Sequence, residues 1–173
     1  AIAVRGANDG LWDWDMRHNR VYYSPRWKNI LGFSDAEISS SPNEWLERIH
    51  KGDASRVQAD LKEHLDGLSA HFESEHRLAL KDGSYLWVLS RGLAVRDSSG
   101  QVTRIAGSLT DISERKKSEE RRIFDALHDS LTGLRNRTAL VEQLRLAIER
   151  TRRYPEHQFA LLYLDLDRFK DVN

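Results

Sequence analysis

One stretch of this sequence, Ser113–Arg122, contains no apolar residue, and it separates two parts that each contain many. A segment of this kind cannot contribute to a hydrophobic core, so the parts on either side of it are expected to fold separately. Apolar residues return directly afterwards, at Ile123 and Phe124. The sequence therefore predicts a connecting helix over residues 112–127. This helix is either a solvated linker or, through its last turns, one strand of a short parallel coiled coil.

Charged residues of opposite sign recur within this stretch at helical spacing. Glu114 is followed by Lys117 one turn later, and Lys116 is followed by Glu120. Ion pairs at these spacings stabilise an exposed helix. Asp111 and Glu114 also have the spacing of a capping box, in which each side chain accepts a hydrogen bond from a free backbone N–H at the helix start. We therefore expect the helix to begin directly after Asp111.

The composition excludes several classes of protein. Lys and Arg number 27, as do Asp and Glu, so the formal net charge is +0 and no overall field attracts the chain to nucleic acid or to a membrane. The absence of cysteine excludes disulfides, thiolate metal sites and cysteine–flavin adducts, and it fits a reducing cytoplasm. No apolar run approaches the roughly 20 residues of a membrane span. The sequence begins without Met, and we expect both ends to continue in a longer protein.

The part before the connecting helix has the pattern of an α+β domain. Short aromatic and β-branched runs come first, then Ser-Pro pairs that start short helices, then one longer amphipathic helix. After it the apolar pattern changes to a period of two, which is typical of strands. The predicted elements are strands at 11–16 and 20–24, helices beginning at Ser24 and Ser41, a helix at 53–67, and strands at 72–80, 84–97 and 101–112. An antiparallel sheet with helices on one face leaves room for a pocket between the layers.

Four segments of this part resemble, in sequence and in order, a PAS domain with its C-terminal PAC motif: GLWDWD, VYYSPRWKNILGF, KDGSYLWVLSRG and GSLTDISERK. The resemblance covers residues 8–117. It implies the PAS fold, a five-stranded antiparallel sheet with small helices on one face, and a sensory or dimerising module rather than an enzyme. It also implies that Asp111 and Glu114 lie where a signal passes from the sheet to the connecting helix.

PAS domains hold haem, a flavin, a small metabolite or no ligand, and this sequence does not select among them. His50, His64 and His76 are candidate axial ligands of a haem iron, although isolated histidines more often form ordinary hydrogen bonds. The tryptophans are candidates for stacking on a ligand, but such side chains more often pack in the core and on sheet faces. They are Trp12, Trp14, Trp27, Trp45 and Trp87. An empty, mainly structural domain is the simplest expectation, and the PAS ligand stays unknown.

The part after the connecting helix begins with a turn-rich segment and an amphipathic helix. Asn136 is a plausible N-cap, and Pro155 ends the helical pattern. The continuous apolar run at 159–164 is short enough for a strand buried on both faces, and Asp165 and Asp167 follow it. Carboxylates at a strand end suit magnesium chemistry on a nucleotide, although a strand that simply ends in polar residues is the simpler explanation.

The segments HDSLTGLRNR and LLYLDLDRFKDVN are similar to the first part of a GGDEF domain. This is the catalytic domain of diguanylate cyclases, which condense two GTP molecules into cyclic di-GMP. The resemblance implies that Asp165 and the backbone carbonyl of Leu166 bind Mg²⁺ (or Mn²⁺). It also places Asn173 at the guanine of GTP, and Phe169 and Lys170 near the phosphates. A structural role falls to the entry motif, whose residues are Asp129, Leu131, Thr132, Asn136 and Arg137.

The GGDEF signature itself does not occur in the sequence, so we expect these 173 residues alone to be catalytically incomplete, an unfinished α/β start of the domain. The first hypothesis is a cytoplasmic bacterial sensor that controls a diguanylate cyclase as a homodimer, through the PAS domain and the connecting helix. The alternative is a non-catalytic sensing and dimerisation module beside a degenerate GGDEF domain and a cyclic di-GMP phosphodiesterase (EAL) domain. The expected boundaries are 1–8 for the end of a preceding helix, 9–111 for the PAS domain, 112–127 for the connecting helix and 128–173 for the GGDEF part.

Overall fold

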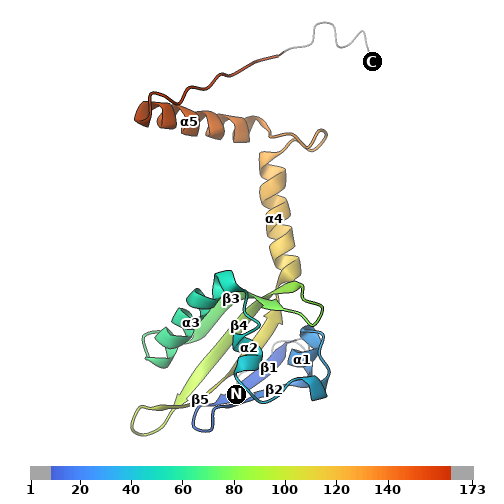
Figure 1. Ribbon diagram of the computed structural model, residues 1–173, viewed down its shortest axis with the longest axis vertical. Helices are drawn as coiled ribbons and strands as arrows, with labels where there is room; N and C mark the ends of the chain where they lie inside the picture. Colours follow the sequence, from blue (N-terminus) through green and yellow to red (C-terminus); the bar gives the residue numbers. More distant parts are fainter. Residues whose placement is uncertain (1–8, 165–173) are drawn as a thin grey trace. The chain divides into compact units, whose positions relative to one another are not determined.

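The computed structural model describes residues 9–164, and the chain divides into two compact units, residues 1–118 and 119–173. The first unit contains a five-stranded sheet in which every neighbouring pair is antiparallel, in the order β2-β1-β5-β4-β3 (Figure 1). The strands are β1 Gly10–Asp15, β2 Arg20–Tyr23, β3 Phe72–Ala79, β4 Tyr85–Arg96 and β5 Val102–Asp111. The predicted five-stranded antiparallel sheet is confirmed.

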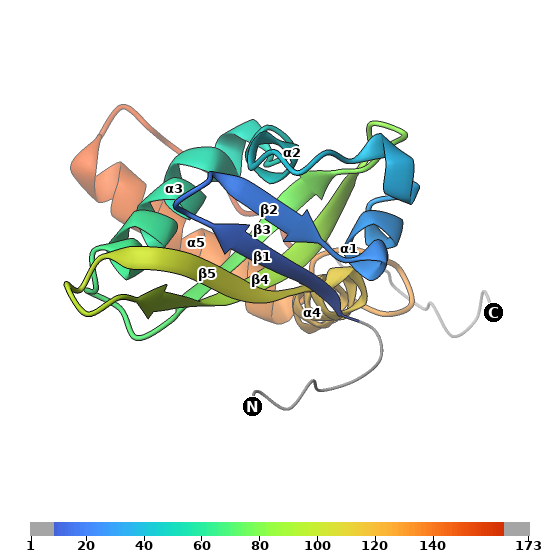
Figure 2. The ribbon, with the colours of Figure 1, turned by 90° about the horizontal axis from the view of Figure 1, so that it is seen from below.

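The helices of the first unit cover one face of this sheet (Figure 2). They are α1 Pro25–Ile30, a 3₁₀ turn at Asp35–Glu37, α2 Asn43–Leu46 and α3 Lys51–Leu65. Ser24 caps α1 by accepting a hydrogen bond from the Trp27 backbone N–H, and Pro25 follows at the first helical position, as the Ser-Pro pair predicts. The predicted start of α3 at Asp53 is two residues late, because His50 caps this helix by accepting from the Gly52 N–H.

The core lies between the sheet and these helices. Alternate residues of β3 point into it, so Phe72, Ser74, His76 and Leu78 are all buried while Glu73 is exposed. From the helical side, α3 contributes Val57 and Leu61, as expected of the amphipathic helix that the sequence predicts. The buried hydrophobic cluster comprises Val21, Tyr23, Trp27, Leu31, Ile38, Ile49, Val57, Leu61, Phe72, Leu78, Val88, Ile105 and Leu109.

Two further helices follow the sheet. The predicted connecting helix is confirmed as α4, Ser113–Leu127, and the helix after it is α5, Arg137–Arg153. Asn136 caps α5 by accepting from the Ala139 N–H, and α5 ends before Pro155, as predicted. Within residues 9–164, each helix is either too short or too polar to cross a lipid bilayer.

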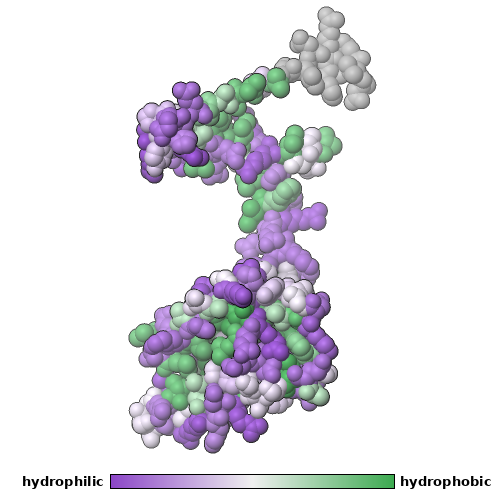
Figure 3. All heavy atoms as spheres, in the orientation of Figure 1, coloured by the Kyte–Doolittle hydropathy of each residue, from purple (hydrophilic) through white to green (hydrophobic). Residues whose placement is uncertain are grey.

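The strand predicted at 159–164 is wrong, because these residues form no strand in the structure. Their apolar side chains are exposed, with Tyr163 at 92% and Leu162 at 77%. A strand needs a neighbour that completes its ladder hydrogen bonds, and the described part of the second unit offers none. Several apolar side chains of α5 are also exposed, Val141 and Leu146 among them, and hydrophobic atoms show on this unit in Figure 3.

One predicted ion pair of α4 is also wrong. Lys116 does not pair with Glu120 along the helix but with Glu75 of β3, at 2.8 Å. The pair of Glu114 with Lys117 is confirmed, at 3.0 Å. Helical spacing brings candidate partners close, but a carboxylate on the adjacent sheet competes for the same ammonium group.

Candidate functional site

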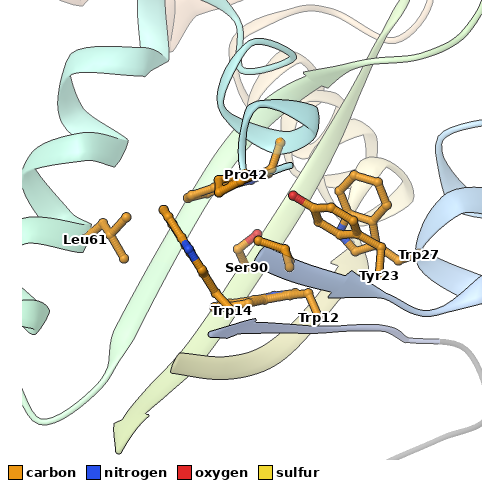
Figure 4. A pocket seen from close by; sticks show the side chains of 9 residues that line it. Trp12, Trp14, Tyr23, Trp27, Pro42, Leu61 and Ser90 are labelled. Atoms are coloured by element: carbon orange, nitrogen blue, oxygen red, sulfur yellow. The ribbon is translucent and has the colours of Figure 1, made fainter. Parts of the chain in front are cut away.

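A small cavity lies between the inner face of the sheet and the helices, and its volume is about 20 Å³. Strands β1, β2 and β4 form its floor, and side chains of α1, α2, α3 and the loop before α2 close it from above (Figure 4). The lining residues are Trp12, Trp14, Val21, Tyr23, Trp27, Pro42, Trp45, Leu61 and Ser90. A cavity of this size accommodates a single water molecule, so any larger ligand requires a lining side chain to move.

Trp12 fills much of the space between the two layers. Its indole lies over two glycines of the sheet, so that a Cβ atom on Gly92 would approach Trp12 Cη2 to 2.6 Å and one on Gly107 would approach Trp12 Cζ2 to 2.7 Å. On its other side the indole stacks on Trp45, with ring centroids 6.5 Å apart and planes 10° apart. Four of the predicted tryptophans therefore pack in the core and line the cavity together, while Trp87 lies on the opposite face of the sheet.

Ser90 is the polar group of this cavity that sequence reasoning missed. Its side chain is 1% exposed, and within residues 9–164 its hydroxyl finds no hydrogen-bond partner. The signal was present in the sequence, because Ser90 continues the inward series of Leu86 and Val88 on β4 and a polar residue there is unexpected. An unpaired buried hydroxyl is the natural point at which a small guest hydrogen-bonds.

Replacing Ser90 with alanine is expected to leave the free energy of unfolding unchanged or to raise it by up to about 1 kcal/mol, since an unpaired buried hydroxyl is lost. Ser74 is the matched control, because it lies directly opposite Ser90 in the ladder and is equally buried. Its hydroxyl donates to Asp60 at 2.8 Å and accepts from Arg56 at 3.0 Å, so Ser74→Ala should cost about 1–2 kcal/mol. Urea unfolding measures both; an equal loss in the two variants would show that Ser90 has a partner, such as a bound water.

Each of the three candidate haem ligands already uses at least one ring nitrogen. His76 Nε2 accepts a hydrogen bond from the Trp45 indole N–H at 3.2 Å, and its Nδ1 donates to the Ser74 carbonyl. His64 Nε2 accepts from the Ala94 N–H at 3.0 Å, and His50 Nδ1 caps α3. None of the three lines the cavity. These contacts assign structural roles to the histidines, and burial lowers the pKa of His76 to about 4, so its ring stays neutral.

The end of the sheet and the start of α4 form only half of the predicted capping box. The Asp111 carboxylate accepts from the Ser113 N–H at 2.8 Å, as a cap does. Glu114, however, points into solvent with its side chain 90% exposed and pairs with Lys117. Asp111 is the last residue of β5 and pairs with Val88 in the ladder, so its backbone belongs to the sheet rather than to the helix end that Glu114 would cap.

The entry motif of the second unit folds into a loop that holds its own shape. Asp129 Oδ1 accepts from the Thr132 N–H at 2.9 Å and from the Thr132 hydroxyl at 2.8 Å, and these bonds lower the pKa of Asp129. Asn136 Nδ2 donates to the Ala126 carbonyl at 2.8 Å, which ties the loop to the end of α4. Leu131 is 90% exposed, and Arg137 is an exposed residue at the start of α5.

The remaining predicted site residues, Asp165, Leu166, Phe169, Lys170 and Asn173, lie outside the described residues. Among residues 9–164, no group of three or more His, Asp and Glu side chains is arranged to hold a metal ion. The described residues therefore contain a nearly filled aromatic cavity, a helix that begins two residues after the last strand of the sheet, and a preformed loop in the second unit.

Two family models match the chain. The model described as the PAS fold matches residues 20–109, and the one described as diguanylate cyclase, GGDEF domain, matches residues 126–173. The connecting helix α4 lies almost entirely between the two matches.

Similar curated proteins include signalling proteins that are much longer than this chain. The uncharacterized protein y4lL of Sinorhizobium fredii is 31% identical over 88% of this chain and 19% of its own length. The probable diguanylate cyclase DgcE of Escherichia coli is 38% identical over 38% of the chain and 6% of its own length. The bifunctional diguanylate cyclase/cyclic di-GMP phosphodiesterase MucR of Pseudomonas aeruginosa is 50% identical over 28% of the chain and 7% of its own length. The chain thus spans less than a fifth of each of these relatives.

Solved structures share the fold of the first unit. A sensory box histidine kinase/response regulator from Burkholderia thailandensis matches with a TM-score of 0.60 and 32% identity, over 87% of this chain and 95% of that one. The N-terminal domain of a diguanylate cyclase with PAS/PAC sensor from Marinobacter aquaeolei matches with a TM-score of 0.56 and 26% identity, over 62% of this chain and 98% of that one.

Proposed function

Because this chain belongs to the PAS fold family, we propose that it is the sensory and connecting part of a signalling protein whose output domain is a diguanylate cyclase. The observation that carries the proposal is the order of the parts: a PAS match, a helix that starts on its sheet, and a GGDEF match. The boundaries we propose are 9–111 for the sensor, 112–127 for the connecting helix and 128–173 for the start of the GGDEF domain; the helix end expected at 1–8 lies outside the described residues.

The reaction proposed for the whole protein is the condensation of two GTP molecules into cyclic di-GMP, in the cytoplasm. By the resemblance to GGDEF domains, Asp165 and the carbonyl of Leu166 would hold Mg²⁺ or Mn²⁺, a Lewis acid for phosphoryl transfer. Asn173 would bind guanine, and the backbone at Phe169 and Lys170 would lie near the phosphates. Each domain would hold one GTP, so two copies must meet, and association through the PAS domain and α4 would bring them together.

A second candidate is favoured by the similarity to MucR, whose name combines a cyclase with a cyclic di-GMP phosphodiesterase. The similarity supports only the phosphodiesterase part of this candidate. The candidate adds that the GGDEF part is degenerate, and that the PAS domain and α4 serve sensing and dimerisation in a protein that degrades cyclic di-GMP through an EAL domain.

The test uses the protein encoded by the complete reading frame, incubated with GTP and Mg²⁺ while cyclic di-GMP is quantified. We expect synthesis that EDTA abolishes and that Asp165→Asn lowers about 100-fold or more, because a metal ligand is lost. The 173-residue chain is the control and should form no product, since it lacks the GGDEF signature. Hydrolysis of added cyclic di-GMP without synthesis would favour the second candidate, and neither activity would overturn both.

A further inference from the structure

One acidic side chain of the sheet holds the start of α4. Glu75 lies on β3 and points away from the core, where its carboxylate accepts from both Arg115 and Lys116. The Lys116 Nζ–Glu75 Oε2 distance is 2.8 Å, and these two side chains are 26% and 34% exposed. Because the pair is partly shielded from water, it is stronger than a fully exposed surface pair.

Trp87 of β4 completes this attachment. Lys116 Nζ lies 5.0 Å from the centroid of the Trp87 ring, a cation–π contact. The backbone takes part as well, because the Ile112 N–H donates to the Trp87 carbonyl at 2.9 Å and the Trp87 N–H donates to Ser113 Oγ at 3.2 Å. Ile112 itself is buried. The first turn of α4 is therefore docked on the sheet, and the Glu75 carboxylate binds two of its cations.

The residues next to Glu75 face the cavity side. Adjacent residues of a strand point to opposite faces, so Ser74 and His76 point inward where Glu75 points outward. His76 accepts the indole N–H of Trp45, and Trp45 lines the cavity. β3 is the outermost strand of the sheet, and the hydrogen bond from Trp45 reaches it directly at His76, the residue next to Glu75.

We propose that Glu75 is a latch between the cavity and the connecting helix. With Trp45 bonded to His76, β3 holds Glu75 against Arg115 and Lys116, and the first turn of α4 stays docked. A guest or a change in the cavity that displaces Trp45 moves β3 at His76, withdraws Glu75 and frees the start of α4. This inference rests on the proposed sensory function, but its test needs neither a ligand nor cyclase activity.

The first test is Glu75→Gln in the 173-residue chain, measured by amide hydrogen exchange of Ile112 and Lys116 followed by NMR. The Lys116 N–H donates to the Ile112 carbonyl, so both amides report docking and the first turn of the helix. We expect both to exchange about tenfold faster, since two charge-assisted contacts are lost. Glu114→Gln is the matched control, because it neutralises an acid in the same turn whose ion pair with Lys117 is exposed, and it should change neither amide.

The coupling is tested by a double-mutant cycle. Trp45→Phe keeps an aromatic ring in the cavity wall but removes the N–H that His76 accepts. It should speed exchange at Ile112 in the wild-type background and have little further effect in Glu75→Gln, because the latch is then already open. Unchanged exchange in Glu75→Gln would overturn the latch, and additive effects would overturn its coupling to the cavity.

Two further observations separate the possible failures. If Glu75→Gln does not fold, Lys116→Gln is measured in its place, because this substitution on the surface of α4 removes the ion pair between Lys116 and Glu75. Raising NaCl to 0.5 M should also speed exchange in the wild type and not in Glu75→Gln, since salt screens a partly exposed pair. Faster exchange in Glu75→Gln, together with no cyclic di-GMP synthesis by the complete protein, would refute the proposed function but not the latch. Unchanged exchange together with cyclic di-GMP synthesis would refute the latch alone.

Discussion

The change Gly107→Ala is expected to prevent the first unit from folding at 25 °C. A Cβ atom on Gly107 would lie 1.8 Å from the carbonyl oxygen of Arg91 and 2.7 Å from Trp12 Cζ2. Gly107 lies between Gly92 of β4 and Trp12 of β1 in the ladder, so the obstructing oxygen belongs to a neighbouring strand and cannot rotate away. Relief requires the two strands to separate, which we expect to cost more than about 4 kcal/mol, a large share of the roughly 5–15 kcal/mol that stabilises a typical domain.

Circular dichroism and urea unfolding measure this effect, and Gly100→Ala serves as its control. Gly100 lies in the turn between β4 and β5 with φ at +85°, and its Cβ would meet nothing within 4 Å. Alanine there should cost only about 1–2 kcal/mol, the strain of a left-handed backbone. If the two variants were equally stable, the close approach of Trp12 and Arg91 to Gly107 would not be what excludes a side chain.

Lowering the pH from 7 to 5 is expected to reduce the free energy of unfolding by about 2 kcal/mol through His76 alone. Burial lowers the pKa of His76 to about 4 from 6.5, so the unfolded chain binds a proton in this range and the folded chain does not. Stability from this group is therefore complete above about pH 6.5 and is lost as the pH falls towards 4. Within that range the folded state keeps the bond from the Trp45 indole to the neutral ring.

The comparison that isolates His76 is His76→Gln, in which an amide oxygen can still accept from Trp45. Urea midpoints at pH 7, 6 and 5 should fall less steeply in this variant than in the wild type. Groups such as Asp53 and Glu37, with pKa values lowered to about 2 by Arg77 and Lys81, are largely ionised in both states over most of this range, and their stabilising effect is lost mainly as the pH falls from about 4.5 to 2. Parallel curves for the two proteins would contradict a buried neutral His76.

The sheet and the helices of the first unit were predictable because their signals are local. A period of two marks the inner face of β3, and a Ser-Pro pair marks the start of α1. The contact of Glu75 with Lys116 was not predictable in this way, since residues far apart in sequence meet only once the strands have paired. The prediction that Glu114 completes a capping box was wrong for a related reason. Asp111 is the last residue of β5, paired with Val88 of the neighbouring strand, and this pairing is not visible in the local sequence.

In the candidate site too, local features were predictable from the sequence, whereas contacts between distant residues were not. The tryptophans in the sequence predict an aromatic core. Only the structure shows that the Trp12 indole packs over Gly107 and Gly92, where a side chain would clash with it. The strand pattern places Ser90 on the inner face of the sheet, but only the structure shows that its buried hydroxyl has no partner among the described residues. The apolar run at 159–164 is typical of a buried strand, but a strand forms only where a second strand pairs with it, and the local sequence does not show whether one is present.

The outer edge of β3 is the place where a strand of another molecule could pair with this sheet. Several backbone groups that point away from β4 are already hydrogen-bonded: the Glu75 carbonyl accepts from Arg56, the Arg77 N–H donates to Asp53, and the Ala79 N–H donates to the Arg48 carbonyl. The Arg77 carbonyl accepts from the His50 N–H. Exposed strand edges recruit strands from other molecules and start aggregates. Side chains of α3 and the backbone of the segment that leads into it thus occupy four positions of this edge, which leaves a second molecule fewer free backbone groups there on which to extend the sheet.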